Sequence, residues 1–361
     1  MWYDRLLEKD LIPDSLIRWG IPKNCRQRLK EETLSDSGLQ QEKLMDLVRL
    51  LKGKPIAEET ESANTQHYEV PTQFFQLVLG KRLKYSCAWW DSKTTGLDQA
   101  ELDMLELTTE RARLHDGHRI LECGCGWGSL SLYMASKYPS SHITAVSNSR
   151  TQKAFIDAQA LERGLTNLHV ITADMNHFNT QEKFDRIVSV EMFEHMRNYK
   201  SLMHKLSSFL HDDGKLFVHI FTHRELSYLY EVVDESDWMS KHFFSGGVMP
   251  SDHLLLYFAD DFKISRHWHV NGLHYAKTSE AWLANMDRHK KDILALFEET
   301  YGREHALKWW VYWRIFFMAC AELWKFNGGK EWMVSHYLFE NRPVRTDKLE
   351  VKQEMKEAWH Q

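Results

Sequence analysis

The chain has 361 residues, of which 43% are hydrophobic and 27% charged, and its net charge is −5. These values are ordinary for a soluble globular protein and provide no basic footprint for nucleic acid. No run approaches the roughly 18–20 apolar residues of a membrane span, and the first residues are charged, unlike a secretory signal. The 5 cysteines are an odd number, which argues against a disulfide framework and for a cytoplasmic location.

Helices are predicted along the first part of the chain, because apolar residues recur at helical spacing in "DRLLEKDLIPDSLIRWGI", "LQQEKLMDLVRLLKGKP" and "VPTQFFQLVLGKRL". A further amphipathic helix is expected over 97–113. Strands and helices then alternate, with strands predicted at 119–123, 142–147, 168–174, 184–192 and 214–221 and helices at 129–139, 150–165 and 198–210. This alternation predicts an α/β fold, in which βαβ units form a parallel sheet with helices on both faces.

The later part of the chain has a different pattern. A mixed, aromatic-rich and histidine-rich segment interrupts the alternation, and the tail from 282 onward is mostly helical. We therefore predict four parts: a helical N-terminal region (1–65), a core with preceding helices (66–220), an insertion (221–300), and a C-terminal region of helices with a final strand (301–361).

A glycine-rich turn, "LECGCGWG", joins a predicted strand to a helix, which is the context of a nucleotide-binding turn. Its glycines permit positive φ and let a ligand approach the backbone. Zinc is disfavoured because no second cysteine pair completes four ligands, and a P-loop would need a following Gly-Lys-Ser/Thr. Glu122 precedes the glycines, and this order suits a ligand with a cationic amino group better than a pyrophosphate.

The turn and the later elements resemble, in order, the motifs of class I S-adenosylmethionine-dependent methyltransferases. The matching stretches are "LECGCGWG", "AVSNSRTQ", "ITADMNHF" and "FDRIVSVEMFEHM". The resemblance implies a Rossmann-like core over 66–220 and an insertion that covers the substrate. It implies S-adenosylmethionine as cofactor, with the adenine at Asp174 and the ribose near Ser147. The implied cofactor-binding residues in these stretches are Glu122, Gly124, Gly126, Asn148, Gln152 and Asp174.

A second resemblance starts at "LKYSCAWW", which is similar to the signature of the cyclopropane fatty acid synthase family. There the Tyr-Ser pair, here Tyr85 and Ser86, closes over the methionine end of the cofactor. From "HYEVPTQFF" to "NGGKEWMVSHYLF" the chain resembles one branch of that family, the benzylisoquinoline alkaloid N-methyltransferases of the coclaurine type. The lipid-modifying synthases hold a bicarbonate base with a cysteine, a glutamate, a histidine and a tyrosine. Cys87 keeps the cysteine, and ungapped counting puts the glutamate at Asp260 and the tyrosine at Phe316, which weakens the lipid interpretation.

The segment "VEMFEHM" places Glu191, Glu194 and His195 at the end of a strand. If it turns helical after Glu191, all three share a face. Carboxylates attract a cationic amine, and a histidine that titrates near neutrality can take its proton. The resemblance implies these roles for the three residues. A metal is not expected, since methyl transfer from a sulfonium needs none; the alternative is that His195 only packs the turn.

The insertion contains "DWMSKHFFSGGVMPS", which looks like a segment that moves over the substrate, with Gly246 and Gly247 as hinge candidates. Trp238, Phe243 and Phe244 are the candidates for an aromatic pocket that favours an ammonium group, or else they belong to a core. The late tryptophan clusters likewise either fill a core or wall a pocket.

The sequence therefore predicts an S-adenosylmethionine-dependent N-methyltransferase of a small, cyclic or aromatic amine. Two alternatives stay open: a cyclopropane synthase-type lipid enzyme, and a catalytically silent cofactor-binding protein. The expected partners are the amine and, from the family resemblance, a second copy of the chain, with no nucleic acid and no integral membrane association.

Overall fold

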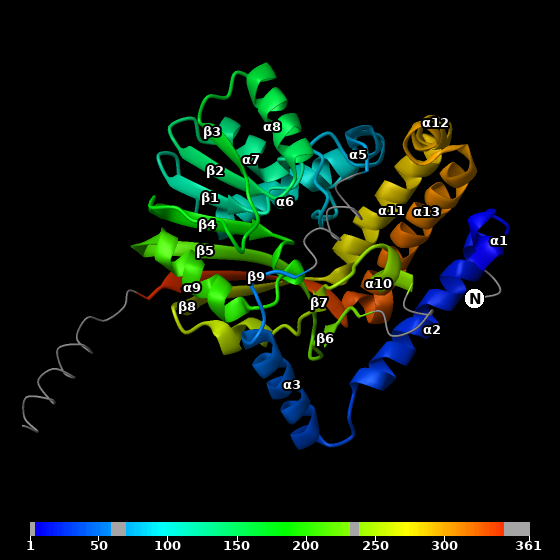
Figure 1. The fold of residues 1–361 in the computed structure, drawn as a ribbon, viewed down its shortest axis with the longest axis horizontal. Coiled ribbons are helices and arrows are strands. Elements are labelled where there is room, and N and C mark those ends of the chain that lie inside the picture. Colours follow the sequence, from blue (N-terminus) through cyan, green and yellow to red (C-terminus); the bar gives the residue numbers. More distant parts are fainter. Residues whose placement is uncertain (1–3, 59–69, 232–237, 343–361) are drawn as a thin grey trace, which may run out of the picture.

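The computed structural model describes residues 4–58, 70–231 and 238–342. At its centre lies a seven-stranded sheet with the order β3-β2-β1-β4-β5-β9-β8, which runs from top to bottom in Figure 1. Strands β1 to β5 are parallel, whereas β9 is antiparallel to both β5 and β8. The strands are β1 (Arg119–Cys123), β2 (His142–Ser147), β3 (Leu168–Thr172), β4 (Phe184–Val190), β5 (Leu210–His223), β8 (Phe262–Val270) and β9 (Trp332–Asn341).

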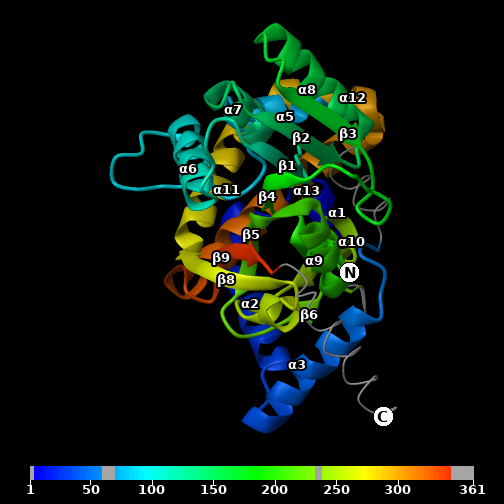
Figure 2. The ribbon, with the colours of Figure 1, turned by 90° about the vertical axis from the view of Figure 1, so that its left-hand side faces the viewer.

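Helices cover both faces of this sheet, which confirms the predicted α/β architecture. The helices α6 (Leu97–Arg111), α7 (Ser129–Lys137) and α8 (Arg150–Glu162) pack on one face. The other face is covered by α3 (Ser37–Lys52), α9 (Tyr199–Phe209) and the 3-10 helix η3 (Leu254–Phe258). Both views place α8 and α3 at opposite ends of the molecule (Figure 1 and Figure 2).

A second, aromatic-rich core lies among helices beside the sheet. It joins α5 (Thr72–Val78), α11 (Gly272–Arg288), α12 (Lys290–Tyr301) and α13 (Arg303–Lys325). Trp313 is buried in it, with its ring centroid 4.7 Å from Phe74 and 5.7 Å from Phe317. Part of the late tryptophan cluster therefore fills a core. The short α1 (Asp4–Glu8), the long α2 (Asp14–Glu32) and the 3-10 helix η4 (Phe326–Gly329) pack at its edges.

The range predicted as an insertion contains several kinds of structure. A small two-stranded sheet, β6 (Tyr228–Leu229) with β7 (Val248–Met249), and α10 (Trp238–His242) lie near its start. Strand β8 belongs to the main sheet, and α11 belongs to the helical core. The predicted boundary at 65 lies outside the described residues, and the four-part division stays a prediction. No described helix is long and apolar enough to cross a membrane.

Arg314 of α13 fastens the N-terminal α2 to the helical core. Its guanidinium donates to both oxygens of Asp14, at 2.8 and 2.6 Å, and to both oxygens of Asp287, at 2.6 and 3.2 Å. Only 8% of Arg314 is exposed, so these charge-assisted bonds are shielded more than those of a surface pair.

We expect Arg314→Met to lower the free energy of unfolding by about 1.5–3 kcal/mol, the usual range for hydrogen bonds to charged groups. The two carboxylates are each partly exposed and will rehydrate, which limits the loss. Urea denaturation followed by circular dichroism measures the change. Arg314→Lys keeps the charge but lacks the planar guanidinium that bonds both oxygens of each carboxylate, so its loss of unfolding free energy should be smaller. Equal stability of Arg314→Met and the wild type would contradict this account.

Candidate active site

The glycine turn lies between β1 and α7, and its backbone is open to a ligand. Gly128 has a φ of 79°, and a Cβ there would come within 2.6 Å of the Ile156 side chain, so the helix and its neighbour pack too closely for any other residue. Gly126 has a φ of 51°, and a Cβ there would meet nothing within 4 Å. Gly126 instead lines a pocket.

This first pocket opens at the carboxyl ends of β1 to β4, where ligands bind in parallel sheets. It brings together every residue predicted to bind the cofactor. These are Tyr85, Ser86, Glu122, Gly124, Gly126, Asn148, Gln152 and Asp174.

Unpartnered polar atoms show that the pocket suits a polar ligand. The Ser147 hydroxyl donates to Gln152 Oε1 over 2.7 Å, and Gln152 Nε2 is then buried without a hydrogen-bond partner. Ser129 also lines the pocket, and its Oγ is likewise buried without a hydrogen-bond partner. Because buried polar groups are normally paired, a ligand with donors and acceptors fits here.

Glu122 adds an acidic group at the floor of this pocket. It is 2% exposed and accepts a hydrogen bond from the Ser131 hydroxyl. Burial raises the pKa of Glu122 to about 8, with Ser131 opposing the rise. A cationic group placed beside it would favour the ionised form.

A second, mostly aromatic pocket adjoins the first. It is lined by Tyr85, Glu191, His195, Phe221, Tyr230, Met239, Phe244, Met249, Tyr275, Trp282, Phe316, Cys320, Leu323 and Trp324. Phe316 and Trp324 come from the aromatic tail, so part of that cluster does wall a pocket. Tyr230 and Trp282 were not predicted from the sequence, because aromatic residues give no local signal that separates a pocket wall from a core.

Of the three predicted pocket residues, only Phe244 is in this lining. Phe243 is fully buried and stacks on Phe316 with ring centroids 4.5 Å apart. Trp238 packs behind Phe243 and against Tyr312, at 5.3 and 5.4 Å. The structure thus places Trp238 and Phe243 behind the wall that Phe316 forms.

Three residues, Tyr85, Glu191 and His195, line both pockets and so mark their junction. His195 is in the 3-10 helix η2 (Phe193–His195), directly after β4. Glu191 has a φ of 48°, a left-handed conformation that is costly for a residue with a Cβ and that concentrates at functional sites.

Hydrogen bonds hold the Glu191 carboxylate in place. Its Oε1 accepts from the Cys87 backbone N–H at 2.9 Å and lies 3.1 Å from His219 Nε2. Its Oε2 accepts from the Tyr275 hydroxyl at 2.6 Å. Burial raises the pKa of Glu191, and the Lys84 ammonium is the strongest opposing influence.

The surroundings of Cys87 differ from the ungapped count. Asp260 is exposed in the loop before β8, so it is not a partner of the buried Cys87 thiol. Phe316 lines the aromatic pocket. The residues that gather at Cys87 are Glu191 and, through its carboxylate, His219 and Tyr275. The correspondence with Asp260 and Phe316 is therefore wrong, because neither side chain belongs to the hydrogen-bonded group at Cys87. A carboxylate of full length and a tyrosine hydroxyl are both present at Cys87, so the lipid interpretation is not weakened by a missing ligand.

Glu194 lies behind the junction and lines neither pocket. Its Oε1 accepts from the Phe221 backbone N–H at 2.7 Å, and its Oε2 is buried without a hydrogen-bond partner. Burial raises the pKa of Glu194 well above its usual range, and the nearby Glu191 adds to the rise. Because the chain makes a 3-10 turn rather than an α-helix here, only Glu191 and His195 face the pockets together.

Lys84 is a buried cation that sequence reasoning missed. It is 3% exposed, lines the first pocket, and donates to the Cys87 carbonyl at 2.8 Å. Burial lowers the pKa of Lys84, with Glu191 opposing. Its hydrogen-bond partners, Ser86 and Cys87, lie in the same stretch. Nothing in "LKYSCAWW" separates this lysine from a solvated one, because the Glu191 charge that acts on it comes from a distant part of the chain.

Known proteins resemble this chain over most of its length. A model of the mycolic acid cyclopropane synthetase family matches residues 57–328. The (S)-coclaurine N-methyltransferase of Thalictrum flavum subsp. glaucum is 40% identical over 340 residues, which cover 93% of this chain and 94% of that protein. The cyclopropane-fatty-acyl-phospholipid synthase of Escherichia coli (strain K12) is 29% identical over 240 residues, 66% of this chain and 60% of that protein. A crystal structure of coclaurine N-methyltransferase bound to N-methylheliamine and SAH has a TM-score of 0.90 at 37% identity, and covers 94% of this chain and 98% of that one.

Proposed function

The chain belongs to the mycolic acid cyclopropane synthetase family, in the branch of the coclaurine N-methyltransferases, and from this premise we propose that it methylates the nitrogen of a small cyclic or aromatic amine. Its fold is the class I methyltransferase fold, and its methyl donor is S-adenosylmethionine. The observation that carries the proposal is the junction of a polar and an aromatic pocket at Tyr85, Glu191 and His195.

The polar pocket suits the donor, which supplies an electrophilic methyl group when bound. The open glycine turn and the unpartnered Ser129 and Gln152 atoms support this assignment. In the proposed arrangement Glu122 faces the donor's amino group and Asp174 its adenine. The remaining contacts are Tyr85, Ser86, Gly124, Gly126, Asn148 and Gln152.

The aromatic pocket suits the acceptor, because aromatic faces attract an ammonium group and bury the rest of a flat molecule. An amine that arrives protonated must lose its proton before its lone pair can attack. Glu191 supplies negative charge at the junction, and His195 accepts the proton, directly or through water. Glu194 stays behind them and positions the turn through the Phe221 N–H.

The lipid alternative is less supported, because the chain is 40% identical to an N-methyltransferase across nearly its whole length and 29% identical to a cyclopropane synthase across a shorter stretch. A cytoplasmic location and a homodimer remain parts of this proposal. They call for separate measurement.

The function is tested by incubating purified protein with methyl-labelled S-adenosylmethionine and a mixed panel of cyclic amines, primary amines and unsaturated phospholipids. We expect label in a cyclic or aromatic amine. Label in the phospholipids would establish the lipid function instead. Cofactor binding in calorimetry without label in any acceptor would favour a silent cofactor-binding protein.

The affinity for S-adenosylmethionine should rise with pH between about pH 6 and pH 7.5. With a pKa near 8, Glu122 is mostly protonated in the free protein at neutral pH. A bound cation favours the carboxylate, so binding releases a proton and strengthens by up to about tenfold per pH unit. Calorimetry in two buffers of different ionisation enthalpy counts that proton, and Glu122→Gln should remove both the proton release and the slope. A wild-type slope that survives in Glu122→Gln would assign it to another group.

A further inference from the structure

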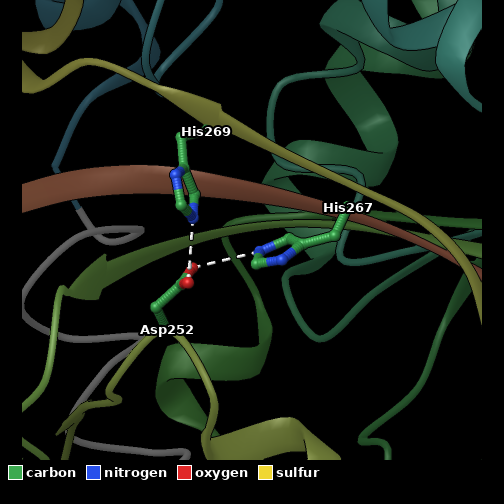
Figure 3. A group of neighbouring side chains, drawn as sticks. All are labelled: Asp252, His267 and His269. Atoms are coloured by element: carbon green, nitrogen blue, oxygen red, sulfur yellow. Dashed lines mark hydrogen bonds and ion pairs between the residues drawn. The ribbon is translucent and has the colours of Figure 1, made fainter.

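A separate group of side chains meets at the edge of the sheet. His267 Nε2 lies 3.1 Å from Asp252 Oδ1, and His269 Nε2 lies 2.8 Å from Asp252 Oδ2. One ligand atom from each residue lies within 4.8 Å of the other two. Figure 3 shows both imidazoles of β8 pointing at the carboxylate, which comes from the segment after β7.

The strand itself creates this convergence. His267 and His269 are two residues apart on β8, and alternate side chains of a strand lie on one face. Asp252 is brought to that face by the chain following β7, where its backbone N–H donates to the His223 carbonyl at 2.8 Å. The three groups therefore meet through the fold, not through a sequence motif.

Neighbouring groups orient these side chains. The Ser335 hydroxyl of β9 donates to Asp252 Oδ1, and the Tyr337 hydroxyl donates to the Asp252 carbonyl. The His267 ring stacks on Tyr337, with centroids 4.3 Å apart and planes 9° from parallel. Such outer contacts fix the orientation of the ligands in metal sites.

The chemistry of the set matches a divalent transition metal. Two imidazoles and one carboxylate suit zinc and its neighbours in the first transition row. Ligand atoms about 2.0–2.1 Å from a tetrahedral ion lie about 3.3 Å apart, so the separations of 3.1 and 2.8 Å need to widen by only a few tenths of an ångström to admit an ion. In the metal-free protein each Nε2 donates a proton to the carboxylate; an ion would take the place of these protons.

We propose that Asp252, His267 and His269 bind one divalent transition-metal ion, with water in the remaining positions. The site is distinct from the catalytic junction, since none of the three lines either pocket. Asp252 follows Gly246 and Phe244 by a few residues, and these line the pockets. An ion would therefore link the segment from Phe244 to Asp252 to strand β8.

The test uses untagged full-length protein treated with a chelator and titrated with zinc, and in parallel with cobalt. We expect one zinc per chain at this site, the intense visible bands of tetrahedral cobalt, and a higher melting temperature with zinc. Both His269→Ala and Asp252→Asn should weaken zinc binding by on the order of 100-fold or more. Replacing a residue that only hydrogen-bonds to a metal ligand already costs about 10–100-fold, and these variants remove a ligand itself. His269 is 56% exposed, so its removal leaves the fold intact.

The matched control is His204→Ala. His204 is exposed and pairs with Asp261 at 3.1 Å, but this pair has no third ligand among the described groups of suitable geometry. The His204→Ala variant should therefore bind zinc as tightly as the wild type does. Binding that is absent in the wild type, or that survives unchanged in both site variants, would overturn the proposal and leave the group as a hydrogen-bonded clamp.

Discussion

Replacing His195 with alanine is expected to lower kcat for N-methylation by about 10²–10⁴-fold, the usual contribution of a general base. The affinity for S-adenosylmethionine should change little, because the polar pocket keeps its other contacts. His195 lies at the junction of the two pockets, where an acceptor nitrogen and the donor's methyl group would meet. Single-turnover rates measure the loss, and calorimetry with the cofactor measures what is retained.

The dependence on pH separates a base from a packing residue. If His195 takes the proton, the pH profile of the wild-type rate contains an ionisation that the variant lacks, and the variant's residual rate follows the ionisation of the free amine alone. A variant that keeps the wild-type profile, with only its cofactor affinity reduced, would give His195 a structural role. His219→Ala is not a suitable control, since His219 contacts Glu191; the exposed His204→Ala is suitable.

Replacing Glu191 with glutamine should lower kcat/KM for the amine by about 10–100-fold, the value of one hydrogen bond to a charged group. Glutamine keeps the size of the side chain but removes the negative charge that faces both pockets. It also presents an amide nitrogen to the Cys87 N–H or the Tyr275 hydroxyl, both of which donate to the native carboxylate. Steady-state kinetics over a range of amine concentrations measures the effect.

Tyr275→Phe is the matched control for Glu191→Gln. It removes the 2.6 Å hydrogen bond to Glu191 Oε2 but keeps the charge, so its loss in kcat/KM should be smaller, about tenfold or less. Equal losses in the two variants would mean that placement of the carboxylate, rather than its charge, limits the rate. A neutral acceptor analogue should not distinguish the wild type from Glu191→Gln.

Much of the fold was predictable because the signals are local. Each strand from β1 to β5 is an apolar run, and helices follow β1, β2 and β4, so that the periodicity changes at those boundaries. The pairing of β9 with β5 and β8 was not predictable, because strands distant in sequence carry no local mark of their partner or direction. The same limit applies to β8, which lies within a range that looked like an insertion.

The site divides in the same way. Apart from Tyr85 and Ser86, which precede β1, the residues predicted to bind the cofactor lie at the ends of successive strands, so their convergence follows from the topology of a parallel sheet. Tyr275 and His219 reach Glu191 from α11 and β5, and no sequence pattern connects them. Phe243 and Phe244 are adjacent, yet one is in the core and the other in the pocket wall, because the turn after α10 directs them to opposite sides.

The carboxylate beside Cys87 is part of the chain. A dissociable anion in that position would occupy it only in proportion to its concentration in the medium, whereas a tethered one has a fixed and high effective concentration. The carboxylate of Glu191 is thus present at the junction in every turnover without being captured from solution. The left-handed backbone of Glu191 is the conformational cost of that permanence.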